Sequence, residues 1–292
     1  MAAPIRPRRS VLFLPGANPR ALEKARSLPA DGLIFDLEDA VAPEGKDDAR
    51  ARVAAALRAG GYAPRELILR VNPLETPWGH ADLEAAATLP LDAVLLPKVE
   101  NAERVHLAIE LLDALGAPPG LPVWCMIETP LGVLAAADIA AASPRLGALV
   151  LGTSDLTKDL RARETRDRRP LMTALGLVLL AGRAHGKAVL DGVHLDLDDA
   201  EGFAFACRQG SEFGFDGKTL IHPTQIDPAN AAFSPTAEEV ARARRIIAAY
   251  GEAAGAGRGA VRIDGRLVEA LHVEAARRTL ALVDAIAARA AG

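Results

Sequence analysis

The chain has 292 residues, of which half are hydrophobic and a quarter are charged, and its formal net charge is −4. This composition allows a large core and excludes general disorder, and the length fits one large domain with an appendage. The negative charge argues against broad nucleic-acid binding, which needs a basic face to displace phosphate counterions. It still allows a small phosphorylated ligand held by a few local cations.

The N-terminal residues are basic, but only the apolar block 11–14 follows before Pro15. That block is too short for the apolar core of a signal peptide, and no run approaches the roughly 18 apolar residues of a membrane helix. Cys125 and Cys207 belong to no CxxC pair, which predicts two buried free thiols. We therefore expect a cytoplasmic protein without a membrane partner.

Eight short apolar runs alternate with helix-length stretches rich in Ala, Leu, Glu and Arg. Strands buried on both faces read as continuous apolar runs, and their alternation with helices indicates a parallel sheet. Eight such units predict a closed (β/α)₈ TIM barrel, whose active site forms at the C-terminal ends of the strands. The predicted strands are Ser10–Pro15, Gly32–Glu38, Glu66–Asn72, Ala93–Val99, Pro122–Glu128, Ala148–Ser154, Ala188–His194 and Phe215–Ile221.

Capping residues mark helices between these strands. Asn18, Asn101 and Asp198 are predicted N-caps, and Pro130 and Pro170 are placed to open helices. The predicted helices cover 18–27, 43–58, 101–115, 130–142, 170–185 and 198–208.

The pattern changes after His222-Pro223. A long helix is predicted over 237–250, then a small-residue linker over 251–259, an extended piece over 260–263 and a final helix over 268–288. We therefore divide the chain into a catalytic barrel, 1–250, and a linker with a C-terminal helical extension, 251–292. The expected task of the extension is to cover a barrel mouth, that of a neighbouring subunit included.

Two acidic residues end neighbouring predicted strands. Glu128 closes the fifth run and Asp155 follows the sixth. Adjacent strands lie about 5 Å apart, so the two carboxylates repel unless a proton or cation lies between them. Hard oxygen ligands at a barrel mouth suit Mg²⁺, which takes one or two carboxylates together with waters and substrate oxygens. The alternative is that each acid pairs with a nearby arginine.

Three further acids lie at or just past the end of the second predicted strand. Asp36, Glu38 and Asp39 are too dense there for packing alone, and they are placed to hold the metal's waters or to orient Arg70 and Lys98. A buried arginine such as Arg70 can grip a carboxylate bidentately. Pairing with Glu38 alone is the competing interpretation of Arg70.

Several other chemistries lack their motifs. The chain has no GxSxG elbow, HExxH motif, Walker loop or GxGxxG after a strand. His194 and His222 follow strands and are more readily explained as structural histidines than as a zinc pair. The charged segment Arg161–Arg169 fits either a solvated loop or a lid whose arginines meet an anionic substrate.

Seven motifs in series resemble the citrate lyase β-subunit-like branch of the HpcH/HpaI aldolase superfamily, over essentially the whole chain. They are Arg9-Ser-Val-Leu-Phe-Leu-Pro-Gly16, Asp36-Leu-Glu-Asp-Ala-Val41, Arg70-Val-Asn72, Pro97-Lys-Val-Glu100, Ile127-Glu-Thr129, Gly152-Thr-Ser-Asp155 and Gly217-Lys-Thr-Leu-Ile-His-Pro223. Malyl-CoA, β-methylmalyl-CoA and citramalyl-CoA lyases belong to this branch.

The resemblance implies roles for individual residues. Glu128 and Asp155 match the Mg²⁺ ligands, and Arg70 matches the residue that polarises the substrate, with Glu38 and Asp39 as further catalytic residues. An acid on the C-terminal segment completes the site in such enzymes, and Glu269 stands here where Asp is usual. The matching wall for coenzyme A comprises Arg9, Pro15, Asn18, Lys24 and Lys98.

The activity implied is Mg²⁺-dependent carbon–carbon cleavage or condensation of a 3-hydroxyacyl-CoA, giving acetyl-CoA or propionyl-CoA and a 2-oxo acid. The alternatives are a malyl-CoA-type thioesterase, a citrate lyase β-type subunit acting on a carrier-bound thioester, and an aldolase for 2-oxo acids without CoA. A homo-oligomer, trimer or hexamer, is expected. The sequence does not choose between the acyl groups.

Overall fold

The computed structural model describes residues 5–255 and 257–291, and the chain divides into two compact units. One unit is Arg8–Phe233, and the other contains 234–291 together with 5–7. The division falls before helix α11 (Ala237–Gly255), not at residue 250 as expected. The reason is packing: Phe233 belongs to the barrel's core, whereas Ala243 and Ile246 of α11 form a separate core with residues that follow.

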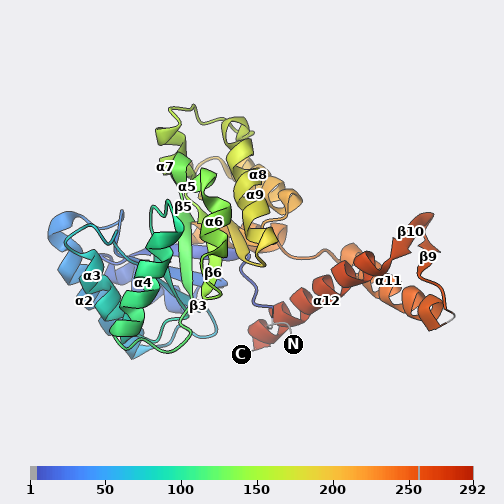
Figure 1. Ribbon diagram of the computed structural model, residues 1–292, viewed down its shortest axis with the longest axis horizontal. Helices are drawn as coiled ribbons and strands as arrows, with labels where there is room; N and C mark the ends of the chain where they lie inside the picture. Colours follow the sequence, from blue (N-terminus) through green and yellow to red (C-terminus); the bar gives the residue numbers. More distant parts are fainter. Residues whose placement is uncertain (1–4, 256, 292) are drawn as a thin grey trace. The chain divides into compact units, whose positions relative to one another are not determined.

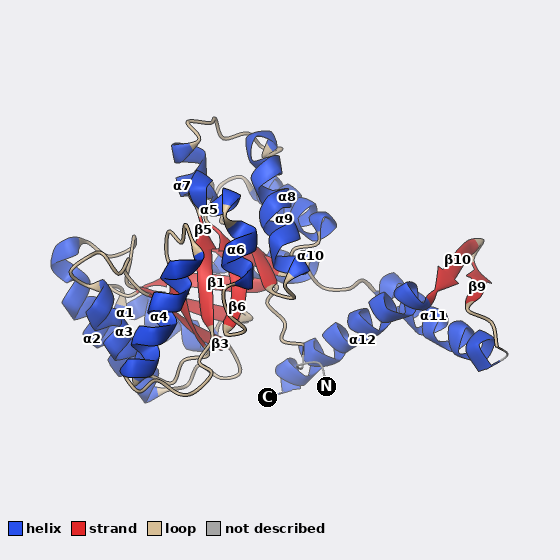
Figure 2. Ribbon diagram, in the orientation of Figure 1, coloured by secondary structure: helices blue, strands red, loops and turns tan. Residues whose placement is uncertain are grey.

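The first unit is a closed parallel barrel of eight strands in sequence order, which confirms the predicted (β/α)₈ fold (Figure 2). Its strands are β1 (Ser10–Pro15), β2 (Gly32–Asp36), β3 (Glu66–Arg70), β4 (Ala93–Leu96), β5 (Val123–Ile127), β6 (Leu146–Leu151), β7 (Ala188–Asp191) and β8 (Gly217–Leu220). Most are shorter than their apolar runs, so Glu38, Glu128 and His194 lie just beyond strand ends.

Each strand is buried on both faces because the barrel has two apolar layers. In β2, Leu33 and Phe35 join the cluster between the strands and the helices, whereas Ile34 joins the cluster inside the barrel. The inner cluster also contains Ile68 and Met126. Every second side chain of a strand therefore points into the barrel. The same alternation decides which of the polar side chains at the strand ends point inward.

Helices surround the barrel (Figure 1). They are α1 (Pro19–Lys24), α2 (Lys46–Ala59), α3 (Gly79–Ala87), α4 (Ala102–Ala114), α5 (Pro130–Leu134), α6 (Ala136–Ala141), α7 (Thr153–Asp159), α8 (Met172–Ala184), α9 (Ala200–Phe213) and α10 (Ile226–Ala232). Asn18, Asn101 and Thr129 cap α1, α4 and α5 through their side chains.

The sequence pattern missed α3, α7 and α10. Residues 153–154, predicted as the end of a strand, instead begin α7, because β6 ends at Leu151. The N-cap of α9 is Asp199, not Asp198, and the helix continues to Phe213. Cys125 and Cys207 are free and buried, as predicted.

The second unit contains α11, a two-stranded hairpin and α12. Strands β9 (Ala260–Ile263) and β10 (Arg266–Glu269) are antiparallel, and α12 covers Ala270–Ala291. The predicted linker is shorter than expected, since 251–255 complete α11, and residues 268–269 belong to β10 and not to the last helix. Residues 256 and 292 of the predicted extension lie outside the described residues. No described helix combines the length and apolar character needed to cross a bilayer.

Candidate active site

A cavity of about 330 Å³ lies at the C-terminal ends of the barrel strands. This volume is in the range of small-molecule sites. The cavity brings together residues that sequence analysis assigned to different roles; its lining includes Pro15, Asp36, Asp39, Arg70, Glu128 and Asp155.

Arg70 is the buried cation of this cavity. It lies two residues after the inward-facing Ile68, so the strand turns its side chain inward. Asp36 accepts bidentately, from Nε at 2.7 Å and from Nη2 at 2.6 Å, while Nη1 lies 2.7 Å from Glu38 Oε2. Burial alone lowers the pKa of Arg70, but the acids outweigh it and raise the pKa above its ordinary value. The guanidinium is therefore fixed in its charged form.

Lys98 lies between the acids that follow β2 and those that follow β5 and β6. Its Nζ donates to Glu38 Oε1 at 2.9 Å and lies 3.7 Å from carboxylate oxygens of both Asp39 and Asp155. Its backbone N–H donates to Glu128 Oε1 at 2.8 Å. Lys98 has a φ of 48°, the left-handed region that non-glycine residues seldom adopt. Both the amine and the backbone N–H of this turn thus contact acids of the site.

The pKa values of Glu38 and Asp39 are shifted in opposite directions. Glu38 is buried, and desolvation raises its pKa despite the attraction of Arg70 and Lys98. Asp39 is more exposed; burial raises its pKa less than Arg70, hydrogen bonding and Lys98 together lower it.

Glu128 follows β5 and is 2% exposed. Burial raises its pKa to about 7, because desolvation exceeds the attraction of Arg70. Gly152 makes room for it, since a Cβ at that position would lie 2.4 Å from both Glu128 Cβ and Oε2. A buried carboxylate with this desolvation cost is a group that a cation stabilises.

Asp155 lies in the first turn of α7, after the strand that pairs with β5. The side chain of Asp155 is 23% exposed, and its Oδ1 lies 2.8 Å from Lys158 Nζ. Glu128 and Asp155 therefore offer hard oxygen atoms on one cavity, as Mg²⁺ requires when waters and substrate complete its shell. Across residues 5–255 and 257–291, no group of three or more His, Cys, Asp or Glu side chains is arranged to hold a metal.

The residues expected to bind coenzyme A do not all lie at the same end of the barrel. Pro15 lines the cavity, and the exposed Asn18 and Lys24 lie at the start and the end of α1. Arg9 precedes β1 at the opposite end of the barrel, where its Nε and Nη2 donate to Asp31 at 2.8 and 2.9 Å. The structure thus removes Arg9 from the expected wall, because a strand's first and last residues lie at opposite ends of the barrel.

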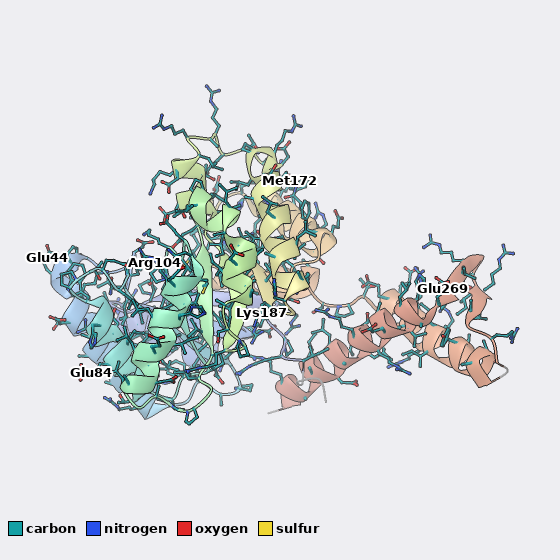
Figure 3. The ribbon with its side chains drawn as sticks, in the orientation of Figure 1. Glu44, Glu84, Arg104, Met172, Lys187 and Glu269 are labelled. Atoms are coloured by element: carbon teal, nitrogen blue, oxygen red, sulfur yellow. The ribbon has the colours of Figure 1, made fainter. Side chains whose placement is uncertain are left out.

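Glu269 belongs to the second unit. It ends β10, where the hairpin passes into α12, and is exposed (Figure 3). Its backbone N–H donates to His272 Nδ1 at 3.1 Å. Its role in the site stays a prediction.

A buried charge cluster that the sequence pattern did not predict lies at the end of β7. Asp191, at the end of β7, accepts from Lys218 Nζ at 3.0 Å and from Arg168 Nη1 at 2.7 Å through both oxygens. Asp191 and Lys218 are fully buried on the outward-facing side of the strands. Arg168 is the last residue but one of the charged loop 161–169, so this cluster anchors the end of that loop. Because the residues before Asp191 are apolar on both faces of the strand, the sequence does not show that its side chain points outward.

Replacing Asp191 by asparagine is expected to destabilise the barrel by about 3–5 kcal/mol, because it leaves two buried cations without their anion. Burial raises the pKa of Asp191, but Lys218 and Arg168 lower it further, so the net shift is downward. The stabilisation is therefore complete above the unfolded carboxyl pKa of about 3.9 and disappears as the pH falls through the folded value.

Urea unfolding of wild type and Asp191→Asn at several pH values measures this difference. It should be largest near neutral pH and narrow below about pH 4. Asp113→Asn, at an exposed pair with Arg145, is the matched control and should cost less than about 1 kcal/mol. A variant at Asp191 no less stable than this control would contradict the assignment.

A second cavity, of about 230 Å³, lies between the 161–169 loop and the residues after β7. It shares Thr153, Ser154, Val193 and Leu195 with the first cavity. The loop's Arg166 makes exposed ion pairs with Asp199 and Glu201, at the start of α9.

The two strand-end histidines have different surroundings. His222 Nδ1 accepts from the backbone N–H of Thr224 at 3.3 Å and so caps a short helical turn. The ring of His194 packs at a tilt of 55° against that of Phe203, and burial lowers the pKa of His194. These contacts support structural roles over a zinc pair.

The chain is similar to known proteins along most of its length. The family model HpcH/HpaI aldolase/citrate lyase matches residues 9–223. A (3S)-malyl-CoA thioesterase of Cereibacter sphaeroides (strain KD131 / KCTC 12085) is 50% identical over 288 residues, covering 99% of each chain. Citrate lyase subunit beta of Escherichia coli (strain K12) is 40% identical over 280 residues, covering 94% of this chain and 93% of that protein.

A solved structure extends the likeness. CitE from Mycobacterium tuberculosis, in complex with magnesium, acetoacetate and coenzyme A, matches with a TM-score of 0.76 at 32% identity, with 98% of each chain covered. The barrel, the order of its motifs and these relatives lead to one conclusion: the chain belongs to the HpcH/HpaI aldolase/citrate lyase family.

Proposed function

We propose that this protein is a Mg²⁺-dependent hydrolase of a malyl-CoA-type thioester. The observation that carries the proposal is one cavity that combines Arg70, charged and buried, with the carboxylates of Glu128 and Asp155. The relative named (3S)-malyl-CoA thioesterase, similar along the whole chain, favours hydrolysis over the carbon–carbon cleavage that the motifs first suggested.

Glu128 and Asp155 are the residues proposed to hold Mg²⁺. Bound there, the ion would supply Lewis-acid polarisation and a template for the substrate's carboxylate and hydroxyl oxygens. The CitE structure with magnesium and coenzyme A supports this choice of cofactor and substrate class. Pro15, Asn18, Lys24 and Lys98 remain the proposed residues of the coenzyme A wall.

Arg70 is proposed to stabilise negative charge on the thioester carbonyl oxygen. A guanidinium has five N–H donors, and Asp36 and Glu38 hold it in place while it lines the cavity. Fixed donors aimed at a developing oxyanion lower the barrier without reorganising. Asp39 and Lys98 complete the charge balance around this group.

Hydrolysis also needs an activated water, and Glu269 is the proposed base. It would take a proton as the water oxygen bonds to the thioester carbon; the C–S bond then breaks, and the thiolate of coenzyme A leaves and is protonated. We propose that Glu269 serves the cavity of a neighbouring subunit in a homo-oligomer, trimer or hexamer.

Carbon–carbon lyase activity is the second candidate, favoured by the relative named citrate lyase subunit beta. A base would remove the hydroxyl proton, the C–C bond would break, and Arg70 would stabilise the enolate of the shorter acyl-CoA until an acid protonates it. A carrier-bound thioester is a further possible substrate of this reaction.

Turnover of malyl-CoA should require Mg²⁺. Treatment with excess EDTA is expected to abolish release of free thiol, and added Mg²⁺ should restore it, because the two buried or partly buried acids need a cation beside the substrate. Thiol release is followed with a chromogenic disulfide reagent. Full activity in excess EDTA would contradict the proposed metal site.

Subunit exchange tests Glu269. Glu269→Ala and Glu128→Ala proteins should each be inactive, and mixed oligomers should regain part of the activity, because some sites would combine an intact metal pair with an intact Glu269. Native mass spectrometry confirms that exchange has occurred. Inactive hybrids would show that Glu269 acts within its own chain or has no catalytic role.

A further inference from the structure

Lys46 lies behind the acids of the site without lining the cavity. It is the first residue of α2, and its side chain is buried. Its Nζ donates to Leu37 O at 2.8 Å, Glu38 O at 2.7 Å and Asn72 Oδ1 at 2.7 Å. An ammonium group has three N–H donors, so these oxygens account for all of them.

The acceptors of Lys46 are themselves tied to the barrel. Asn72 Nδ2 donates to Leu37 O at 2.9 Å and to Asp82 Oδ2 at 2.7 Å. Arg50 Nε donates to the other oxygen of Asp82 at 2.6 Å. The ring of Trp78 lies 5.4 Å from Lys46 Nζ. All the side-chain N–H donors of Lys46 and Asn72 are thus engaged. Satisfied buried hydrogen bonds of this kind make a segment rigid, and the loss of Lys46 would take three of them away.

The network ends on the peptide groups that carry Glu38. Two of the three acceptors of Lys46 are the carbonyls of Leu37 and Glu38, and the Glu38 carboxylate contacts Lys98 at 2.9 Å and Arg70 at 2.7 Å. A shift of this turn would therefore move the carboxylate that holds both cations of the cavity.

We propose that Lys46 is a positioning residue, which fixes the 36–41 turn so that Glu38 and Asp39 hold Arg70 and Lys98 in their reactive positions. The kinetic part of this inference depends on the proposed function. Small misplacements of groups that orient a catalytic residue cost about ten- to a hundredfold in rate.

Lys46→Met removes the three donors and keeps an unbranched side chain that is one atom shorter. Its kcat for malyl-CoA is expected to fall about ten- to a hundredfold while KM stays within about twofold. The matched control is Lys187→Met, because Lys187 Nζ also donates to a backbone carbonyl, that of Ser143 at 2.9 Å (Figure 3). Lys187 directly precedes β7, at the end of the barrel opposite the cavity, so its kcat should not change.

Hydrogen exchange tests the position of the turn without any activity. The amides of Glu38 and Ala40 donate to Asp36, and that of Val41 donates to Glu38 O, so they should be protected in wild type. Exchange in 36–41 should be faster in Lys46→Met than in Lys187→Met at equal global stability. If Lys46→Met does not fold, Lys46→Gln, which keeps an N–H donor pair, is used in its place.

A double-mutant cycle with Glu38→Gln separates positioning from general destabilisation. If Lys46 acts through Glu38, its replacement should lower kcat little further in the Glu38→Gln protein. Additive losses, a wild-type kcat in Lys46→Met, or unchanged exchange in 36–41 would each overturn the inference. If wild type does not turn over malyl-CoA, the proposed function fails, and the exchange comparison still decides whether Lys46 fixes the turn.

Discussion

Replacing Arg70 by lysine is expected to lower kcat/KM by at least about a hundredfold, or roughly 2.7 kcal/mol of transition-state stabilisation. The positive charge is retained, but a lysine has one nitrogen where Arg70 uses Nε and Nη2 for Asp36 and Nη1 for Glu38. A single ammonium nitrogen cannot reproduce the bidentate contact with Asp36, the contact with Glu38 and a fixed donor toward the cavity together, because it has only three N–H donors. Steady-state kinetics with malyl-CoA measure the effect.

The control for this variant is Arg104→Lys. Arg104 is an arginine of α4 that pairs with Glu75 outside the cavity, and it is labelled in Figure 3. That protein should keep the wild-type rate. Circular dichroism and thermal unfolding establish that Arg70→Lys is folded, and a folded variant with a near-normal rate would remove Arg70 from the chemistry.

Replacing Glu128 by glutamine is expected to lower both kcat and Mg²⁺ affinity by at least about a hundredfold. Replacing a residue that only orients a metal ligand already lowers metal affinity or activity about ten- to a hundredfold, and Glu128 is proposed to bind the metal directly. Glutamine keeps the size of the side chain and an oxygen acceptor for the Lys98 N–H but removes the charge. Calorimetric titration with Mg²⁺ measures binding independently of turnover.

Glu84→Gln provides the comparison, because Glu84 is an exposed acid of α3 (Figure 3). Its Mg²⁺ affinity and kcat should equal those of wild type. Unchanged Mg²⁺ affinity in Glu128→Gln would mean that the ion binds elsewhere, and the proposed chemistry would then lose its metal site.

The barrel was predictable because its strands are buried on both faces. Residues such as Leu33, Ile34 and Phe35 are all apolar, although they face two different layers, and a run of this kind between helix signals indicates a parallel strand. The gathering of Arg70 and Glu128 in one cavity followed from their places at strand ends. The family resemblance added their expected roles.

Other features depend on tertiary contacts that a pattern does not contain. The unit boundary after Phe233 is set by the packing of α11 against the hairpin and α12, which no local signal reports. Asp191 and Lys218 are charged residues on the outward face of strands, where they pair with each other and Asp191 also pairs with Arg168. Arg9 lies in the right motif but at the wrong end of its strand.

Product analysis tests the proposed function most directly. Purified protein and Mg²⁺ are incubated in ¹⁸O-labelled water with malyl-CoA, and in parallel with methylmalyl-, citramalyl- and citryl-CoA, and the products are identified by mass. We predict free coenzyme A and the intact hydroxy acid from malyl-CoA, with ¹⁸O in the newly formed carboxylate. A 2-oxo acid together with a shorter acyl-CoA would contradict hydrolysis and assign the chain to the carbon–carbon lyases.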